Sequence, residues 1–190
     1  MKHLYLSAAL ACVSAPVVAD AVTFNLDASH SQIVFSYNHL GFSTTYGMFS
    51  GFEGAIQFDA DAPDTSSVSV SMPVMSMFTG WESRDAHFMG SDFFDATDGD
   101  MVTFTSTDIE VTGDATANIT GELTMNDVTK SVVLETTLNQ AGDNPMSGAP
   151  WIGFDATTTI LRSDFGVGNF APFISDEVDV IISIEAGAAG

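Results

Sequence analysis

Cysteine is the first residue type that the sequence nearly lacks. The only cysteine, Cys12, lies within the first 19 residues, so residues 20–190 contain none. That part of the chain therefore has no disulfide bond, no cysteine nucleophile and no thiolate metal ligand. A domain without disulfides depends for its stability on an apolar core or on a closed sheet.

Basic residues are also scarce. The chain has four lysines and arginines against 25 aspartates and glutamates, which gives a formal net charge of −21. This charge repels nucleic acids and the headgroups of anionic lipids, and it excludes both as partners docked on the surface. The acidic residues are spread along the chain, which indicates a solvated outer face.

Long hydrophobic runs are absent except near the N-terminus. Residues 1–3 are a short basic start, residues 4–13 form an apolar run, and Val17-Val18-Ala19 is typical of a cleavage site. The run is shorter than the roughly 20 residues of a transmembrane helix. We therefore predict a signal peptide over residues 1–19, a single domain over residues 20–190, a periplasmic location and no stable membrane insertion. Cleavage after Ala21 is the alternative, and the residues before Cys12 match a lipoprotein signal poorly.

Apolar and polar residues alternate with a period of two through most of the remaining chain, as in strands with one wet face. Turn residues separate the alternating segments at 59–64, 98–100, 113–114 and 143–145, and Asn126-Asp127 predicts a tight hairpin. This pattern predicts an all-β domain of about eight antiparallel strands, as a sandwich or as a closed barrel. Residues 75–94 do not alternate, and we expect them to form a short helical connection covering one end.

The sequence has few signs of catalysis. It contains no Gly-x-Ser-x-Gly motif and no phosphate-binding loop. The spacing of His30, His39 and His87 resembles no zinc site. We therefore predict that the protein is not an enzyme and binds no metal.

Aromatic residues and methionines, in contrast, are abundant, with fifteen Phe and nine Met. An eight-stranded barrel can be filled by side chains or can hold one ligand. The cluster of Met72, Met75, Met77 and Met89 favours a ligand, because flexible thioethers adapt to irregular guests.

Four stretches in this order resemble the YceI-like family of periplasmic, lipocalin-like polyisoprenoid-binding proteins, and the resemblance covers nearly all of residues 20–190. They are His30-Ser31-x-Ile33-x-Phe35-x-x-x-His39-x-Gly41-x-Ser43, continuing to Phe58; Arg84-Asp85-x-His87-Phe88-x-x-Ser91-Asp92-Phe93-Phe94-Asp95; Gly121-x-Leu123-Thr124-Met125-x-x-Val128-Thr129-Lys130; and Arg162-Ser163-Asp164-Phe165-Gly166. The chain departs from the family pattern in two turns, at residues 98–100 and at Asp127.

The resemblance implies an extended, eight-stranded antiparallel lipocalin-like β-barrel whose tunnel holds an isoprenoid quinone, a polyprenyl lipid or a similar amphiphile, with no other cofactor. It also implies that the chain can form a homodimer. We predict that the tunnel is lined by apolar side chains of the barrel and of the connection, namely Phe35, Tyr37, Phe49, Phe52, Ile56, Met75, Met77, Phe78, Trp81, Phe88, Phe94 and Phe104.

Four residues are candidates for contacts with the ligand's headgroup: His39, Arg84, His87 and Arg162. Guanidinium groups match phosphate geometry, and histidines can hydrogen-bond a quinone or a pyrophosphate. The alternative is structural: ion pairs of Arg84 with Asp85 and of Arg162 with Asp164, and a core position for His39.

The predicted function is therefore sequestration or transport of a long-chain isoprenoid lipid. The alternative is a structural or stress-response barrel that is filled by side chains and acts through its surface. A weaker reading is an enzyme that acts on a bound prenyl lipid.

Overall fold

The computed structural model describes residues 21–190. The predicted signal peptide, residues 1–19, and its cleavage site after Ala19 lie outside the described residues. Among the described residues, no helix is long and apolar enough to cross a bilayer.

Ten antiparallel strands make up most of the domain, because alternating apolar and polar residues favour strands with one buried face. The strands are β1 (Val22–Leu26), β2 (Gln32–His39), β3 (Ser43–Phe49), β4 (Glu53–Phe58), β5 (Ser67–Pro73), β6 (Met101–Val111), β7 (Thr116–Met125), β8 (Val128–Asp143), β9 (Pro150–Leu161) and β10 (Glu177–Ala188). One α-helix, α1 (Glu82–Met89), and three 3₁₀ turns, η1 (Pro63–Thr65), η2 (Val74–Ser76) and η3 (Arg162–Phe165), lie between them.

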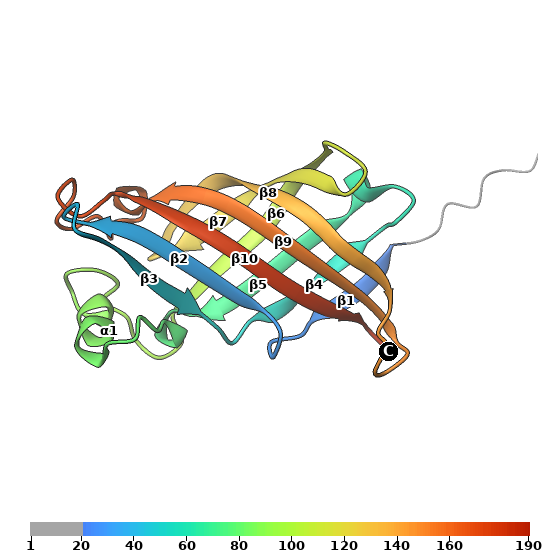
Figure 1. Ribbon diagram of the computed structural model, residues 1–190, viewed down its shortest axis with the longest axis horizontal. Coiled ribbons are helices and arrows are strands. Elements are labelled where there is room, and N and C mark those ends of the chain that lie inside the picture. Colours follow the sequence, from blue (N-terminus) through green and yellow to red (C-terminus); the bar gives the residue numbers. More distant parts are fainter. Residues whose placement is uncertain (1–20) are drawn as a thin grey trace, which may run out of the picture.

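The strands close into one extended barrel (Figure 1). The sheet runs in the order β1-β4-β5-β6-β7-β8-β9-β10-β2-β3, and β1 also pairs with β10. β1 and β2 lie end to end along the same edge of β10, at Ala186–Ala188 and at Asp179–Ser183 respectively. β4 pairs with β1 and β3 pairs with β2, so β3 and β4 also share one position. Ten strands therefore occupy eight positions around the barrel, which confirms the predicted eight-stranded antiparallel β-barrel.

The short helical connection lies at one end of the barrel, as predicted. α1 and its neighbouring turns lie at the left-hand end in Figure 1. The connection pairs with the wall at β3, where the backbones of Met48 and Phe78 exchange two hydrogen bonds of 2.9 Å.

At the same end of the barrel, β8 and β9 separate. Their pairing begins at Glu135 and Thr157, so that residues 128–134 of β8 pair only with β7. η3 lies beside this part of β8, and the Asn126 side chain donates a 3.0 Å hydrogen bond to the carbonyl of Phe165. Phe165 is only 1% exposed and packs in the core cluster with Met125, so η3 fills the wall where the strands diverge.

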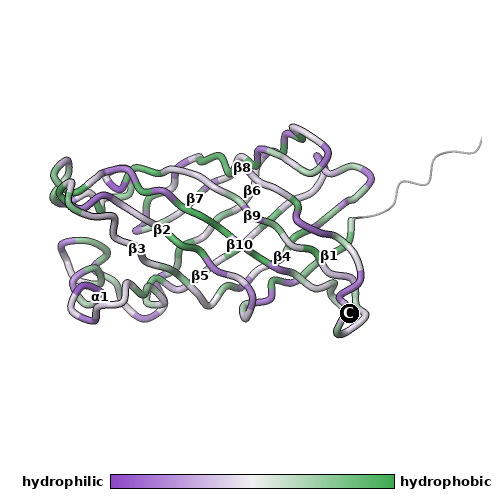
Figure 2. The backbone as a smooth tube through the Cα atoms, in the orientation of Figure 1, coloured by the Kyte–Doolittle hydropathy of each residue, from purple (hydrophilic) through white to green (hydrophobic). Residues whose placement is uncertain are grey.

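Two glycines allow rings to lie against the inside of the wall. A Cβ at Gly47 would lie 2.2 Å from the Phe35 ring, and one at Gly121 would lie 2.3 Å from the Phe104 ring. Each glycine leaves the space that a large ring on the neighbouring strand occupies. Hydrophobic residues occur in strands along the whole barrel (Figure 2), and the buried ones form two core clusters.

Candidate functional site: an apolar cavity along the barrel

The inward-facing rows of the strands enclose a cavity of about 420 Å³. At the α1 end its lining includes Phe88, Phe93 and Arg162, and at the other end it includes Pro63 in η1 and Thr116 in β7. The lining is almost entirely apolar between these ends, and the volume lies in the range of about 300–1,000 Å³ typical of small-molecule sites. The barrel therefore has room for an elongated apolar ligand.

Nine of the twelve residues that we predicted for the tunnel line this cavity: Phe35, Tyr37, Phe49, Phe52, Ile56, Met77, Phe88, Phe94 and Phe104. They come from β2, β3, the β3–β4 junction, β4, β6 and the α1 connection. Their contact with a ligand remains a prediction.

The prediction was wrong for the other three residues, because the cavity lining does not include Met75, Phe78 or Trp81. All three side chains are exposed, at 48%, 59% and 61%. The chain leaves the barrel at η2, and the backbone pairing of Phe78 with Met48 continues the wall rather than its lining. Trp81 lies beneath the guanidinium of Arg84, which is 5.9 Å from the centre of its ring.

Sequence reasoning missed many of the lining residues. They include an aromatic residue of the connection, Phe93. They also include members of the inward rows of β5, β7, β8, β9 and β10, such as Val70, Leu123, Leu134, Phe154, Val180 and Ile182. The signal for the strand residues was present, because each belongs to an alternating row whose apolar members face one side.

Arg162 is the only basic residue in the lining of the described cavity, and its hydrogen bonds are already made. Its guanidinium donates to the carbonyls of Ser175 at 2.8 and 2.9 Å, Val167 at 2.8 Å, Ile174 at 3.2 Å and Asn169 at 3.3 Å. These contacts account for all five of its N–H groups. Burial lowers the pKa of Arg162. The residue therefore holds the loop between η3 and β10 and has no donor left for a headgroup.

Arg84 lies outside the cavity lining. Its Nε donates to the Thr79 hydroxyl at 2.8 Å, and its Nη2 donates to the Thr79 carbonyl at 2.7 Å. Asp85 accepts hydrogen bonds from the same hydroxyl and from the Thr79 amide. Thr79 thus stands between Arg84 and Asp85, in place of the direct ion pair considered from the sequence.

Arg162 and Asp164 also do not form the direct ion pair considered from the sequence. Asp164 lies 3.8 Å from the amine of Lys130. The Ser163 amide and hydroxyl donate to Asp176, which lowers the pKa of that carboxyl.

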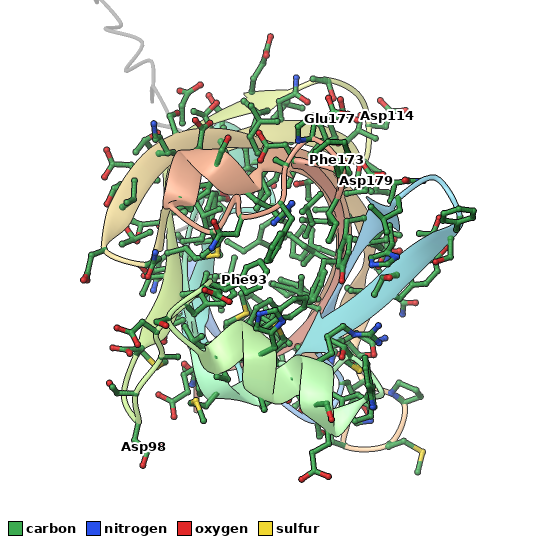
Figure 3. The ribbon with its side chains drawn as sticks, turned by 90° about the vertical axis from the view of Figure 1, so that its left-hand side faces the viewer. Phe93, Asp98, Asp114, Phe173, Glu177 and Asp179 are labelled. Carbon is green, nitrogen blue, oxygen red and sulfur yellow. The ribbon has the colours of Figure 1, made fainter. Side chains whose placement is uncertain are left out.

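The two histidines of the predicted headgroup set lie near the α1 end. His39 is half-buried, pairs with Ser43 and Ile174, and is not part of the lining. His87 Nε2 lies 3.0 Å from Asp92 Oδ2. The ring of His87 meets that of Phe93 edge-on at 5.1 Å, and Phe93 points toward the middle of the end-on view (Figure 3). His87 therefore lies beside the mouth of the cavity, just outside its lining.

The three histidines do not come together. His30 instead joins Asp27 and Glu185 in a cluster whose ligand atoms lie within 4.8 Å of one another. Its Nδ1 is 2.6 Å from Asp27 Oδ2, and Trp151 Nε1 donates to Glu185 at 2.8 Å. The hydrogen bond from His30 holds the pKa of Asp27 at about 2, and the same bond raises the pKa of His30. These hydrogen bonds explain why Asp27, His30 and Glu185 lie together where β1 ends beside β10.

Comparison with known proteins gives a consistent result. The family described as the YceI-like domain matches residues 24–186. The chain is 36% identical to a UPF0312 protein of Ectopseudomonas mendocina over 175 residues, which cover 92% of this chain and 91% of the relative. It is 38% identical to Protein YceI of Shigella flexneri over 168 residues, covering 88% and 87%.

Solved structures share the fold. BcnA of Burkholderia cenocepacia superposes with a TM-score of 0.76 at 26% identity, covering 85% of this chain and 99% of that one. The YCEI protein of Campylobacter jejuni gives 0.72 at 28% identity, covering 80% and 90%. A polyisoprenoid binding domain from Saccharophagus degradans gives 0.69 at 16% identity, covering 88% and 99%.

Proposed function

Because this chain belongs to the YceI-like domain family, we propose that it binds a long-chain isoprenoid or similar lipid inside its barrel and carries or sequesters that lipid in the periplasm. The observation that carries the proposal is the continuous apolar cavity, which extends from the α1 connection to η1. The name of the Saccharophagus degradans relative, a polyisoprenoid binding domain of the same fold, supports this class of ligand.

The energetics suit a carrier. Transferring a prenyl tail from water into the barrel gains roughly 0.8 kcal/mol for each CH₂. Such a lipid, however, starts in a membrane, where its tail is already out of water. Transfer from membrane to cavity is then nearly neutral, so the protein can both take up and release its ligand.

The cavity also bears on the alternative of a barrel filled by side chains. A space of about 420 Å³ lined by apolar residues is much larger than the small voids of a packed core. We therefore favour binding over a structural role, and we propose binding without a chemical step. The homodimer implied by family resemblance remains a prediction.

The headgroup is best placed at the α1 end, beside His87. Of the other three candidates, Arg162 donates all its N–H groups to carbonyls of the η3–β10 loop, and Arg84 donates to Thr79 outside the lining. His39 does not line the cavity. In the described part of the chain His87 has one hydrogen-bond partner, Asp92 at Nε2, so its Nδ1 remains free to meet a polar headgroup.

Native mass spectrometry of protein purified from a periplasm, followed by organic extraction, tests this function. We expect one apolar adduct per chain, with a mass that identifies its isoprenoid tail and headgroup. A protein that is empty and also fails to take up added ubiquinone or polyprenyl lipid would rule out the carrier function.

A further inference from the structure

We propose that the α1 end of the barrel docks on the surface of a zwitterionic phospholipid bilayer through four exposed apolar side chains, Leu40, Phe42, Phe170 and Phe173, which we term the mouth rim. This proposal rests on the proposed function, because a carrier of membrane lipids has to meet a membrane. It adds the surface that makes the contact and the kind of membrane that this surface fits.

The mouth rim is formed by two loops that lie side by side. Leu40 and Phe42 occupy the turn between β2 and β3, and Phe170 and Phe173 lie in the loop between η3 and β10. The loops are joined by the bridge between His39 and Ile174, and by a 3.0 Å hydrogen bond from the Ser175 amide to the Asn38 carbonyl. Figure 3 views the barrel from this end and labels Phe173.

The rim side chains protrude into solvent. Phe42 is 90% exposed and Phe173 is 77% exposed, while Leu40 and Phe170 are about half exposed. A cluster of exposed apolar side chains at the tips of loops is typical of an interaction site. Tips that protrude fit a fluid bilayer interface better than the rigid surface of a folded partner, which would need a matching pocket.

Two rim residues also have an unusual backbone. Leu40 and Phe170 have positive φ angles of 57° and 67°. Bulky residues rarely adopt this conformation, in which glycine or asparagine is more favourable. Large apolar side chains at two such turns indicate that the side chains themselves serve a purpose.

The rim is continuous with the cavity. The ring of Phe170 lies 6.1 Å from that of Phe93 and 6.4 Å from that of His87. Phe93 lines the cavity, and its ring is 5.0 Å from that of Phe88, which also lines it. An apolar path therefore leads from the rim into the barrel, as a lipid leaving a bilayer requires.

Charge selects the type of membrane. Asp92, Asp164 and Asp176 lie near this end, and the three described basic residues, Arg84, Lys130 and Arg162, all contact protein groups. A strongly acidic chain without a free basic cluster is repelled by anionic headgroups. The rim therefore fits phosphatidylcholine or phosphatidylethanolamine better than phosphatidylglycerol.

Flotation of the mature protein with phosphatidylcholine vesicles tests the docking surface. We expect the wild type to float with the vesicles. The vesicle partition coefficient of the variant Phe42→Ser/Phe173→Ser should be lower by about a hundredfold, because each of the two inserted Phe side chains contributes about a factor of ten to partitioning. Phosphatidylglycerol vesicles should recover less protein. Met146→Ser is the matched control, because Met146 is 93% exposed in the β8–β9 turn at the opposite end, and it should float like the wild type.

Binding of a short-chain ubiquinone without vesicles separates this proposal from the function on which it rests. We expect the wild type and both variants to bind the quinone equally, because none of the changed residues lines the cavity. Quinone binding without rim-dependent flotation would overturn the docking surface and leave the carrier function intact. Rim-dependent flotation without quinone binding would support docking and contradict the carrier function. A dimer that forms without vesicles and is lost in the Phe42→Ser/Phe173→Ser variant would show that the rim joins two copies, which also overturns the proposal.

Discussion

Ile181 and Ile182 are neighbours on β10 that face opposite sides of the barrel wall. Ile182 lines the cavity, whereas Ile181 is 56% exposed on the outside. We expect Ile182→Trp to reduce the ligand content of the purified protein by about tenfold or more, because filling the narrow cavity removes contacts worth over about 1.4 kcal/mol. Native mass spectrometry measures this content. Ile181→Trp is the matched control and should keep its ligand; equal loss in both variants would count against the cavity as the binding site.

Arg162 distinguishes structural from ligand-binding roles at the level of one side chain. Lysine cannot reproduce its bonds to four carbonyls, so we expect Arg162→Lys to lower the free energy of unfolding by about 2–4 kcal/mol. Urea unfolding checks this value. Arg84→Lys, where the arginine bonds only to Thr79, should change it by less than about 1 kcal/mol. A normal stability for Arg162→Lys, together with an altered ligand headgroup, would restore Arg162 to the binding site.

The hydrogen bond between Asp27 and His30 predicts a pH dependence. The pKa of Asp27 is lowered from 3.8 to about 2, so its contribution is present above about pH 4 and lost as the pH falls toward 2. The pKa of His30 is raised above 6.5, so its contribution is present below pH 6.5 and lost as the pH rises through the raised value. The pair therefore stabilises most between these limits.

His30→Asn tests the alkaline side of this window. As the pH rises from 6.5 through the raised pKa of His30, we expect the wild type to lose a component of stability that the variant lacks. Urea midpoints measured across this range provide the comparison. Asp27→Asn should flatten the same part of the pH profile, and the double variant Asp27→Asn/His30→Asn should show no further flattening. A pH profile that is unchanged in His30→Asn would contradict the role of the Asp27–His30 pair.

At the scale of elements, the hairpin of β7 and β8 illustrates a turn read directly from the chain. Asn126 and Asp127 both have positive φ, at 53° and 59°, and Met125 pairs with Val128 around them. Such two-residue turns favour Asn-Gly. We expect Asp127→Gly to raise the free energy of unfolding by about 0.5–1 kcal/mol, because glycine adopts this conformation without strain.

Asp98→Gly is the control for that change. It removes the same negative charge from an exposed turn, but Asp98 does not have a positive φ. Urea unfolding should therefore show a gain for Asp127→Gly that Asp98→Gly lacks. Equal gains would assign the effect to charge, not to the backbone.

At the scale of the whole molecule, the dominant feature is charge. Residues 20–190 contain three basic residues and 25 acidic ones, a formal net charge of −22. Salt screens repulsion between exposed charges over a Debye length of about 10 Å at 0.1 M. We expect the melting temperature, measured by calorimetry, to rise as sodium chloride is added up to about 0.5 M. A flat or falling response would show that the acidic residues lie too far apart to destabilise the barrel.

Much of the wall was predictable from the sequence alone. The period-two rows identify which face of each strand is apolar, and rows such as Phe35 with Tyr37 do line the cavity. The hairpin at Asn126-Asp127 was equally clear. These features are local, because strand periodicity and turn chemistry act over a few residues.

Tertiary structure decided the rest. Barrel closure depends on β1 and β2 sharing one edge of β10, a pairing between residues more than 140 positions apart. Met75, Phe78 and Trp81 lie outside because their segment follows no strand period and is placed by its pairing with β3. The carbonyls that hold Arg162 come from a loop whose path the residue types do not specify. The sequence therefore determined which face of each strand is apolar. Long-range pairing determined how the barrel closes, where its mouth lies and which side-chain hydrogen-bond donors remain free for a ligand.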